Sequence, residues 1–134
     1  MTSWVIEGQL ARGRRPGYDG ERSQNVARAD VDTWVEDIKA AGIRSIICLL
    51  ADDQLRLYGV LGGGLLSHYR EAGFAVEHVP ARDHQHPPLT QTHLDEIWRA
   101  YQSLPKPVLV HCSAGVDRTG RAIEHIRRQL GFVS

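Results

Sequence analysis

Short apolar segments that alternate with helix-like segments constrain this fold most. The segments 43–50 (IRSIICLL), 74–80 (FAVEHVP) and 106–112 (KPVLVHC) are apolar and carry β-branched residues, as buried parallel strands do. The alternation predicts β-α-β units, and therefore an α/β three-layer sandwich whose mostly parallel central sheet has roughly four to five strands flanked by helices. The segments with apolar residues at helical spacing are 30–42, 65–73, 89–104 and 118–131.

The segments between these elements predict a hairpin and loops. Residues 4–11 (WVIEGQLA) are typical of an opening strand or hairpin, and 12–25 combine glycine, proline and charge as loops do. Residues 51–64 predict a loop or an irregular helix. Residues 81–88 predict a loop, because two prolines exclude a regular helix. Asp30 is expected to be the N-cap of the first helix.

The composition fits one ordinary globular domain over residues 1–134. Lysine plus arginine and aspartate plus glutamate both number 16, so no general basic field favours nucleic acid. No apolar run approaches the ~18 residues of a membrane span, and the first residues lack a signal-peptide pattern. Two cysteines, Cys48 and Cys112, are too few for a disulfide scaffold. We therefore expect a cytoplasmic protein, monomer or dimer, with no nucleic-acid or membrane partner.

The segment 111–120 (HCSAGVDRTG) lies between the last predicted strand and the last predicted helix. A tight loop there turns successive backbone N–H groups inward at a helix N-terminus, where they can bind an oxyanion. Arg118 offers a planar fork that can hold two phosphate oxygens, and Gly115 can adopt the positive φ of a tight turn. The expected phosphate-binding residues are Ser113, Ala114, Gly115, Val116, Asp117 and Arg118.

Cys112 is the expected nucleophile of this loop. A helix N-terminus and a nearby cation favour the thiolate, which can attack a bound phosphorus atom. Thr119 is expected to donate a hydrogen bond to the sulfur and to help it leave later. His111 is expected to brace the loop through hydrogen bonds rather than to transfer protons.

The pattern H-C-x-x-G-x-x-R-T over 111–119 resembles the signature of the cysteine-based protein tyrosine phosphatase superfamily. The short chain resembles its compact dual-specificity branch, and the resemblance covers roughly Leu10 to Leu130. It implies a phosphocysteine intermediate, no metal or other cofactor, and hydrolysis of a phosphorylated protein or a small phosphomonoester.

The resemblance also implies a general acid on an upstream loop. The segment VPARDHQHPPL is similar to the family's acid loop and carries Asp83, 29 residues before Cys112. Asp52 or Asp53, at the end of the preceding strand, is the alternative acid.

The segment LARGRRPGY is similar to one that follows the first strand in compact members of the superfamily. It places arginines either at the rim of the site, where they would attract an anionic substrate, or in a solvated basic loop. These arginines are Arg12, Arg14 and Arg15.

Two features depart from the most common pattern. A carboxylate at Asp117 would repel phosphate, so it is expected to point away and to bind a backbone N–H or a basic side chain. Some branches of the superfamily that the chain resembles, including lipid phosphatases and bacterial tyrosine phosphatases, have this aspartate. Lipid-directed members often carry lysines in the loop, and here none lies between Cys112 and Arg118. The last helix has a short apolar stripe (Ala122, Ile123, Ile126, Leu130), which predicts a minimal domain or a dimer.

Several alternatives stay open. The same residues could form a phosphate-binding adaptor without activity, or a rhodanese-like or arsenate-reducing thiol enzyme. Inositol phosphates, phosphoinositides or RNA 5′-phosphates could replace a phosphoprotein as substrate. By resemblance, Cys48 could form a protective disulfide with an oxidised Cys112. His84, His86 and His93 could be metal ligands, although loop histidines are usually just solvated, and His84 and His86 could contact substrate from the acid loop.

Overall fold

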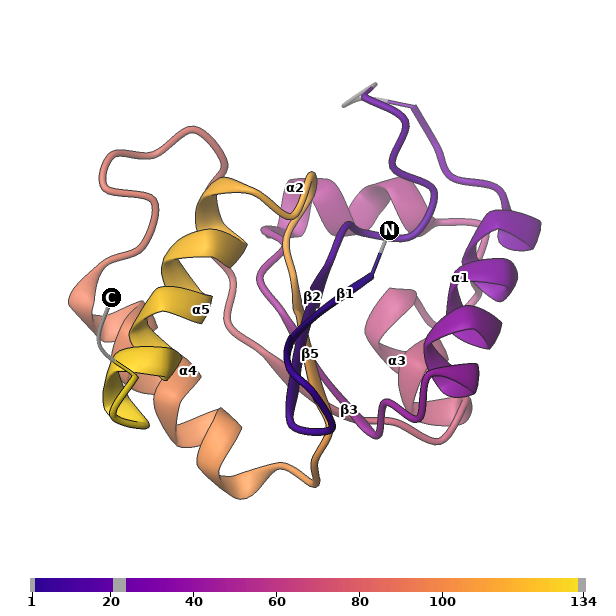
Figure 1. Ribbon diagram of the computed structural model, residues 1–134. Coiled ribbons are helices and arrows are strands. Elements are labelled where there is room, and N and C mark those ends of the chain that lie inside the picture. The colour runs from indigo at the N-terminus through magenta and orange to yellow at the C-terminus, as the bar shows by residue number, and fades with distance from the viewer. Residues whose placement is uncertain (1, 21–23, 133–134) are drawn as a thin grey trace.

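The computed structural model describes residues 2–20 and 24–132, and a five-stranded sheet lies at the centre of this part of the chain. The strand order is β1-β2-β5-β3-β4, with β1 antiparallel to β2 and the other neighbours parallel (Figure 1). This arrangement confirms the predicted α/β class and the mostly parallel sheet. The strands are β1 (Ser3–Ile6), β2 (Leu10–Gly13), β3 (Ser45–Cys48), β4 (Ala75–His78) and β5 (Val108–His111).

Helices cover both faces of the sheet, as Figure 1 shows. Two helices, α1 (Arg28–Ala40) and α3 (Leu65–Glu71), pack on one face. Two others, α4 (Gln91–Ser103) and α5 (Asp117–Gln129), pack on the opposite face. A short helix α2 (Asp52–Leu55) continues into the 3-10 turn η1 (Arg56–Tyr58) after β3.

The period-2 alternation of β3 divides the core between these two faces. Ile46 and Cys48 lie in the cluster with α1 and α3, whereas Ile47 and Leu49 lie in the cluster with α4 and α5. All four are fully buried. Burial of an aliphatic side chain such as Ile46, Ile47 or Leu49 contributes about 1.5–3 kcal/mol, so residues of this inner strand and its end stabilise both outer layers.

The carboxyl ends of the parallel strands meet at one edge of the sheet. His111 on β5 is level with both Cys48 on β3 and Gly13 on β2, and Cys48 is level with His78 on β4. The four loops that follow these residues therefore gather at the same edge, where ligands collect in open α/β sheets.

Three details differ from the prediction. The first helix begins at Arg28 with Ala27 as N-cap, and Asp30 lies inside its first turn, where its charge complements the helix dipole. Strand β2 extends through Gly13 into the segment expected to be loop, because β5 pairs with it. The apolar stripe of α5 ends early, since the Leu130 side chain is 41% exposed. No helix within residues 2–20 and 24–132 is long and apolar enough to cross a membrane.

Candidate active site

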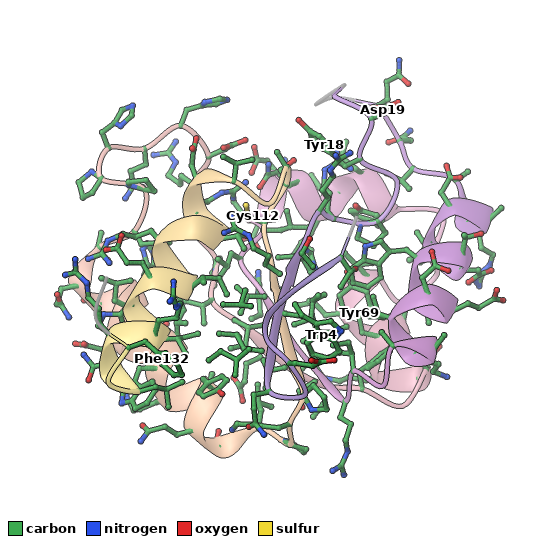
Figure 2. All side chains as sticks on the ribbon, in the orientation of Figure 1. Trp4, Tyr18, Asp19, Tyr69, Cys112 and Phe132 are labelled. Atoms are coloured by element: carbon green, nitrogen blue, oxygen red, sulfur yellow. The ribbon has the colours of Figure 1, made fainter. Side chains whose placement is uncertain are left out.

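Residues 112–118, here called the cysteine loop, connect β5 to α5 at the carboxyl edge of the sheet and include the first two residues of that helix (Figure 2). The Cys112 side chain is nearly fully buried, so the thiol lies at the base of the loop. Gly115 has φ +79°, and a Cβ atom there would lie 2.5 Å from the carbonyl oxygen of Gly13. Glycine is therefore required at this position for both its conformation and its close approach to β2.

His111 fixes the start of the cysteine loop from beneath. Its Nδ1 lies 3.0 Å from the Cys112 carbonyl oxygen, and its Nε2 lies 2.9 Å from the Tyr69 hydroxyl. Burial, reinforced by Arg118 and Arg15, lowers the pKa of His111 to about 4, so the ring is neutral at physiological pH.

The tautomer of His111 follows from these partners. Nδ1 donates to the carbonyl oxygen, since a carbonyl can only accept, and Nε2 accepts from the Tyr69 hydroxyl. Burial raises the pKa of Tyr69 well above its usual value, so its proton stays available for this bond.

Arg15 supports the cysteine loop from the segment after β2. Its side chain is 2% exposed and donates from Nε to the Ser113 hydroxyl at 3.0 Å, while its backbone N–H donates to the Ser113 carbonyl at 2.9 Å. Its Nη1 donates to the Tyr58 hydroxyl at 3.2 Å, which in turn donates to the Pro16 carbonyl at 2.6 Å. This buried network corrects the expectation of a rim or solvated position for Arg15.

The other two arginines of this segment differ from Arg15. Arg12 is partly buried and donates to the Gly115 carbonyl at 2.7 Å, so it also braces the cysteine loop. Arg14 is exposed, its carbonyl accepts a hydrogen bond from Trp34, and its guanidinium carbon lies 6.0 Å from the centre of the Tyr18 ring. Among the three, only Arg14 has the exposed side chain that a substrate-attracting rim requires.

Arg118 is 2% exposed and its guanidinium group is held firmly on one side. Nη1 donates to the Ala81 carbonyl at 2.7 Å, the Gln54 Oε1 atom at 2.9 Å and the Leu49 carbonyl at 3.3 Å. Nη2 lies 3.6 Å from a carboxylate oxygen of Asp83, which is an ion pair, but it has no hydrogen-bond partner within the described residues. A buried cationic N–H donor without a partner is costly, and a phosphate oxygen is the kind of acceptor that would satisfy it.

Asp83 reaches the site from the loop between β4 and α4. Its carboxylate accepts from the Gln54 side chain at 3.4 Å and from the His84 backbone N–H at 3.0 Å. His84 has φ +59°, an uncommon conformation for a residue other than glycine. Asp52 and Asp53, the alternative acids, are exposed at the start of α2, whereas Asp83 is the carboxylate that the structure brings to Arg118.

Sequence reasoning missed Gln54, which connects the two groups expected to do the chemistry. It is nearly buried, its carbonyl oxygen holds Arg118, and its NH2 group holds Asp83. A polar residue in the first turn after a buried strand end was the available signal, but it does not by itself indicate which partners the side chain meets.

The remaining residues of the loop differ in how they are placed. Thr119 Oγ1 is fully buried and has no hydrogen-bond partner in the described part of the chain, so the predicted bond to the Cys112 sulfur is not formed here. Val116 is 62% exposed. Asp117 is also exposed and is the first residue of α5, where the helix dipole stabilises its negative charge. Ala114 is half-buried.

Comparison with known proteins identifies the family. The family described as a polymorphic toxin system DSP-PTPase phosphatase, Tc-R-P, matches residues 22–127. The chain belongs to this family. A search of curated proteins finds no match for this DSP-PTPase phosphatase.

Solved structures share the fold of this phosphatase. Tk-PTP, in a glycine-to-alanine mutant form, is 22% identical with a TM-score of 0.68, and the match covers 99% of this chain and 74% of Tk-PTP. The catalytic core of the PP-IP phosphatase SIW14 from S. cerevisiae, in complex with citrate, is 19% identical with a TM-score of 0.65, covering 98% and 68%. Kinase associated phosphatase, with its catalytic-site cysteine replaced by serine, is 19% identical with a TM-score of 0.63, covering 87% and 65%.

The second cysteine of the phosphatase lies on the other side of the sheet. Cys48 belongs to the core cluster under α1 and α3, and Cys112 to the cluster under α4 and α5. Burial raises the pKa of the Cys48 thiol to about 12, so it is a protonated core residue. Because the two cysteines belong to core clusters on opposite faces of the sheet, this placement does not favour the protective disulfide that the resemblance allows.

The histidines near the Asp83 loop do not gather into a metal site. Within residues 2–20 and 24–132, no three histidine, cysteine or acidic side chains are placed to hold a metal ion. His93 instead closes the N-terminus of α4, since its ring accepts from the Thr90 backbone N–H at 3.1 Å and Thr90 accepts from the His93 backbone N–H.

Proposed function

We propose that this phosphatase hydrolyses phosphomonoesters through a phosphocysteine intermediate on Cys112. The observation that carries the proposal is the buried Nη2 atom of Arg118, which has an ion-pair partner but no hydrogen-bond acceptor within the described chain. Arg118 lies in the first turn of α5, where the backbone N–H groups of the cysteine loop also favour an anion. These donors form a site for a phosphoryl group next to the thiol.

In the first step, the Cys112 thiolate attacks the phosphorus atom. The S–P bond forms and the P–O bond to the leaving group breaks, while Arg118 and the loop N–H groups stabilise the charge on the three equatorial oxygens. Asp83 donates its proton to the leaving oxygen. The phosphoryl group is then attached to the sulfur and the alcohol or phenol departs.

In the second step, water attacks the phosphocysteine. Asp83, now ionised, accepts a proton from the water as the new P–O bond forms and the S–P bond breaks. Inorganic phosphate leaves, and the thiolate and the protonated acid are restored. Gln54 holds Asp83 and Arg118 in one relative position through both steps, because its amide contacts each of them.

The substrate class we propose is a phosphorylated protein or a small phosphomonoester. Membership in the DSP-PTPase family supports a phosphorylated substrate. The hollow beside the site is about 680 Å³, open, and lined by residues of α2 and the Asp83 loop, which suits a substrate that projects a phosphorylated side chain.

The first experiment is p-nitrophenyl phosphate hydrolysis with EDTA present, comparing wild type with Cys112→Ser. We expect activity in wild type, inhibition by vanadate, and loss of turnover in the variant. Vanadate binding without turnover in wild type would refute hydrolysis and favour a phosphate-binding adaptor. Neither activity nor binding would show that the cysteine loop is not an anion site.

Asp83→Asn tests the general acid. We expect it to lower kcat for phenyl phosphate by about 10²–10⁴-fold and to lower it much less for p-nitrophenyl phosphate, whose leaving group needs little protonation. Asp52→Asn and Asp53→Asn are the matched controls. Equal losses for both substrates would remove Asp83 from the acid role.

A further inference from the structure

The backbone of the cysteine loop has carbonyl groups with donors and N–H groups without acceptors. Within residues 2–20 and 24–132, no backbone N–H group of residues 113–116 donates to an acceptor. In contrast, the carbonyl oxygens of Cys112, Ser113, Gly115 and Val116 each lie within hydrogen-bond distance of a donor. Consecutive backbone N–H groups without acceptors are the arrangement that binds an anion.

The direction of each carbonyl group sets the direction of the next N–H group. The peptide units of the loop are trans and planar, so a carbonyl and the N–H that follows it point in opposite directions. His111 Nδ1 lies 3.0 Å from the Cys112 carbonyl oxygen, which turns the Ser113 N–H away from His111. The Arg15 backbone N–H donates to the Ser113 carbonyl at 2.9 Å, which turns the Ala114 N–H away from Arg15. These two supports therefore direct two N–H groups towards the inside of the loop.

Arg12 supports the second half of the loop in the same way. Its Nη2 atom donates to the Gly115 carbonyl at 2.7 Å and lies 3.4 Å from the Val116 carbonyl oxygen. The Val116 carbonyl also accepts from the Gly120 backbone N–H at 2.8 Å, whereas the Gly115 carbonyl has no second donor in the described part of the chain. Arg12 is therefore the side chain that fixes the peptide unit carrying the Val116 N–H group.

Glycine makes this peptide unit the easiest one in the loop to rotate. Gly115 has φ +79°, and without a Cβ atom it can change between backbone conformations that other residues avoid. Rotation of the unit would bring the Gly115 carbonyl to the inside of the loop, where its partial negative charge repels a phosphate oxygen. The Val116 N–H would then point outwards. The hydrogen bond from the charged Arg12 side chain opposes this rotation.

The fold places the Arg12 side chain on the outer side of the loop. Arg12 on β2 is level with Val110 on β5, the strand that leads into the loop. Its Nη2 atom lies beside α5 at Gly120, where a Cβ atom would be 3.5 Å away. The side chain also borders a hollow of about 210 Å³, which Arg127 lines as well. Because the Nη2 atom already donates to the loop carbonyls, Arg12 acts on a bound phosphate through the backbone and not as a direct ligand.

We propose that Arg12 is a positioning residue that keeps the Val116 N–H group directed at the phosphoryl group. This inference rests on the proposed function, because it concerns the same phosphate site. The Ser113 and Ala114 N–H groups have their own supports, so they stay directed at the anion when Arg12 is replaced. Only the Val116 donor is then lost for part of the time.

The first test follows single N–H groups by NMR. Inorganic phosphate is titrated into Cys112→Ser, which can bind the anion without chemistry, and into the double variant Cys112→Ser, Arg12→Met. An amide proton that binds a phosphate oxygen moves downfield. We expect the Ser113, Ala114 and Val116 signals to move in Cys112→Ser. In the double variant only the Val116 shift should become smaller.

The second test measures the phosphate dissociation constant of the same two proteins by calorimetry. We expect Arg12→Met to raise it about tenfold, because the anion loses one backbone hydrogen bond and bonds to charged groups have at least this effect. Arg127→Met, also in Cys112→Ser, is the matched control. It removes an equal charge from the same hollow, but the Arg127 side chain is exposed and lies against the Phe132 ring, so the constant should stay within about twofold.

Urea unfolding of each variant separates positioning from a purely structural role. A lower urea midpoint for Arg12→Met with an unchanged phosphate dissociation constant would overturn the inference. An equal loss of affinity in Arg127→Met would overturn it too, because the effect would then come from charge at a distance. An equal Val116 shift with and without Arg12 would have the same consequence.

Two further results keep the inference separate from the variants and from the proposed function. A Val116 signal that does not move with phosphate in Cys112→Ser would overturn the inference, and this measurement needs no change at Arg12, so it stands even if Arg12→Met does not fold. Hydrolysis of p-nitrophenyl phosphate by wild type tests the proposed function alone, because the phosphate titrations involve no turnover.

Discussion

Gln54→Ala tests whether the bridge between Arg118 and Asp83 matters for catalysis. The substitution removes one of three acceptors from Nη1 of Arg118, the one at 2.9 Å, and leaves the Ala81 and Leu49 carbonyls. A hydrogen bond to a charged group contributes about 1.5–3 kcal/mol, and the lower figure applies because two acceptors remain. If that free energy holds the guanidinium in its phosphate-binding orientation, kcat/KM falls about tenfold.

The loss should be visible in more than the rate. Because vanadate binds where the phosphoryl group does, the vanadate dissociation constant should rise together with the fall in kcat/KM when Arg118 loses this acceptor. We would measure kcat and KM for p-nitrophenyl phosphate between pH 4.5 and 8, and the vanadate dissociation constant. Gln85→Ala, on the Asp83 loop, is the control. A kcat/KM within about twofold of wild type, with an unchanged vanadate dissociation constant, would refute the reasoning.

Three further predictions concern stability. Gly115→Ala should lower the free energy of unfolding by about 2 kcal/mol or more and should abolish activity. Gly8 also has a positive φ, +75°, but open space surrounds it, so Gly8→Ala should lower the free energy of unfolding only by the backbone strain of about 1–2 kcal/mol. Urea unfolding measures both changes. Arg15→Ala should lower the free energy of unfolding by about 2–4 kcal/mol, because two buried hydroxyl groups lose their donor. For the exposed Arg14→Ala we expect a change below about 0.5 kcal/mol, and a change that small in Arg15→Ala would contradict the prediction. The lowered pKa of His111 predicts that the free energy of unfolding falls by up to about 3 kcal/mol as the pH drops from 6.5 towards 4. The reason is that the unfolded chain binds a proton in this pH range and the buried ring does not. If the urea midpoint of His111→Asn had the same pH slope as wild type, His111 would be excluded as the origin.

The fold could be predicted because its signals are local. The strands 43–50 and 106–112 are short, apolar and β-branched, and each lies next to a segment with helical spacing, so the class and the parallel sheet follow from the pattern alone. The cysteine loop was found for the same reason. Its residues are consecutive, and the position of the loop between a strand and a helix is visible in the sequence.

The supporting contacts could not be predicted because they join distant segments. Arg15 looked like part of a charged surface loop, and only the close approach of β2 to β5 places it under Ser113. The local signal at Gln54, a polar residue just after a buried strand, does not reveal its role, because that role depends on Asp83 and Arg118, which lie 29 and 64 residues away along the chain. The expected hydrogen bond from Thr119 failed because sequence spacing does not set the direction of a side chain.

The residues that build the site are divided between the two halves of the chain. Arg12, Arg15 and Gln54 precede the glycine-rich connection at residues 59–64, whereas Asp83 and the cysteine loop follow it. A chain cut at this exposed connection would leave neither fragment with a complete phosphate site. Two such fragments would become active only when β2 docks beside β5, so phosphate release would report their reassembly directly.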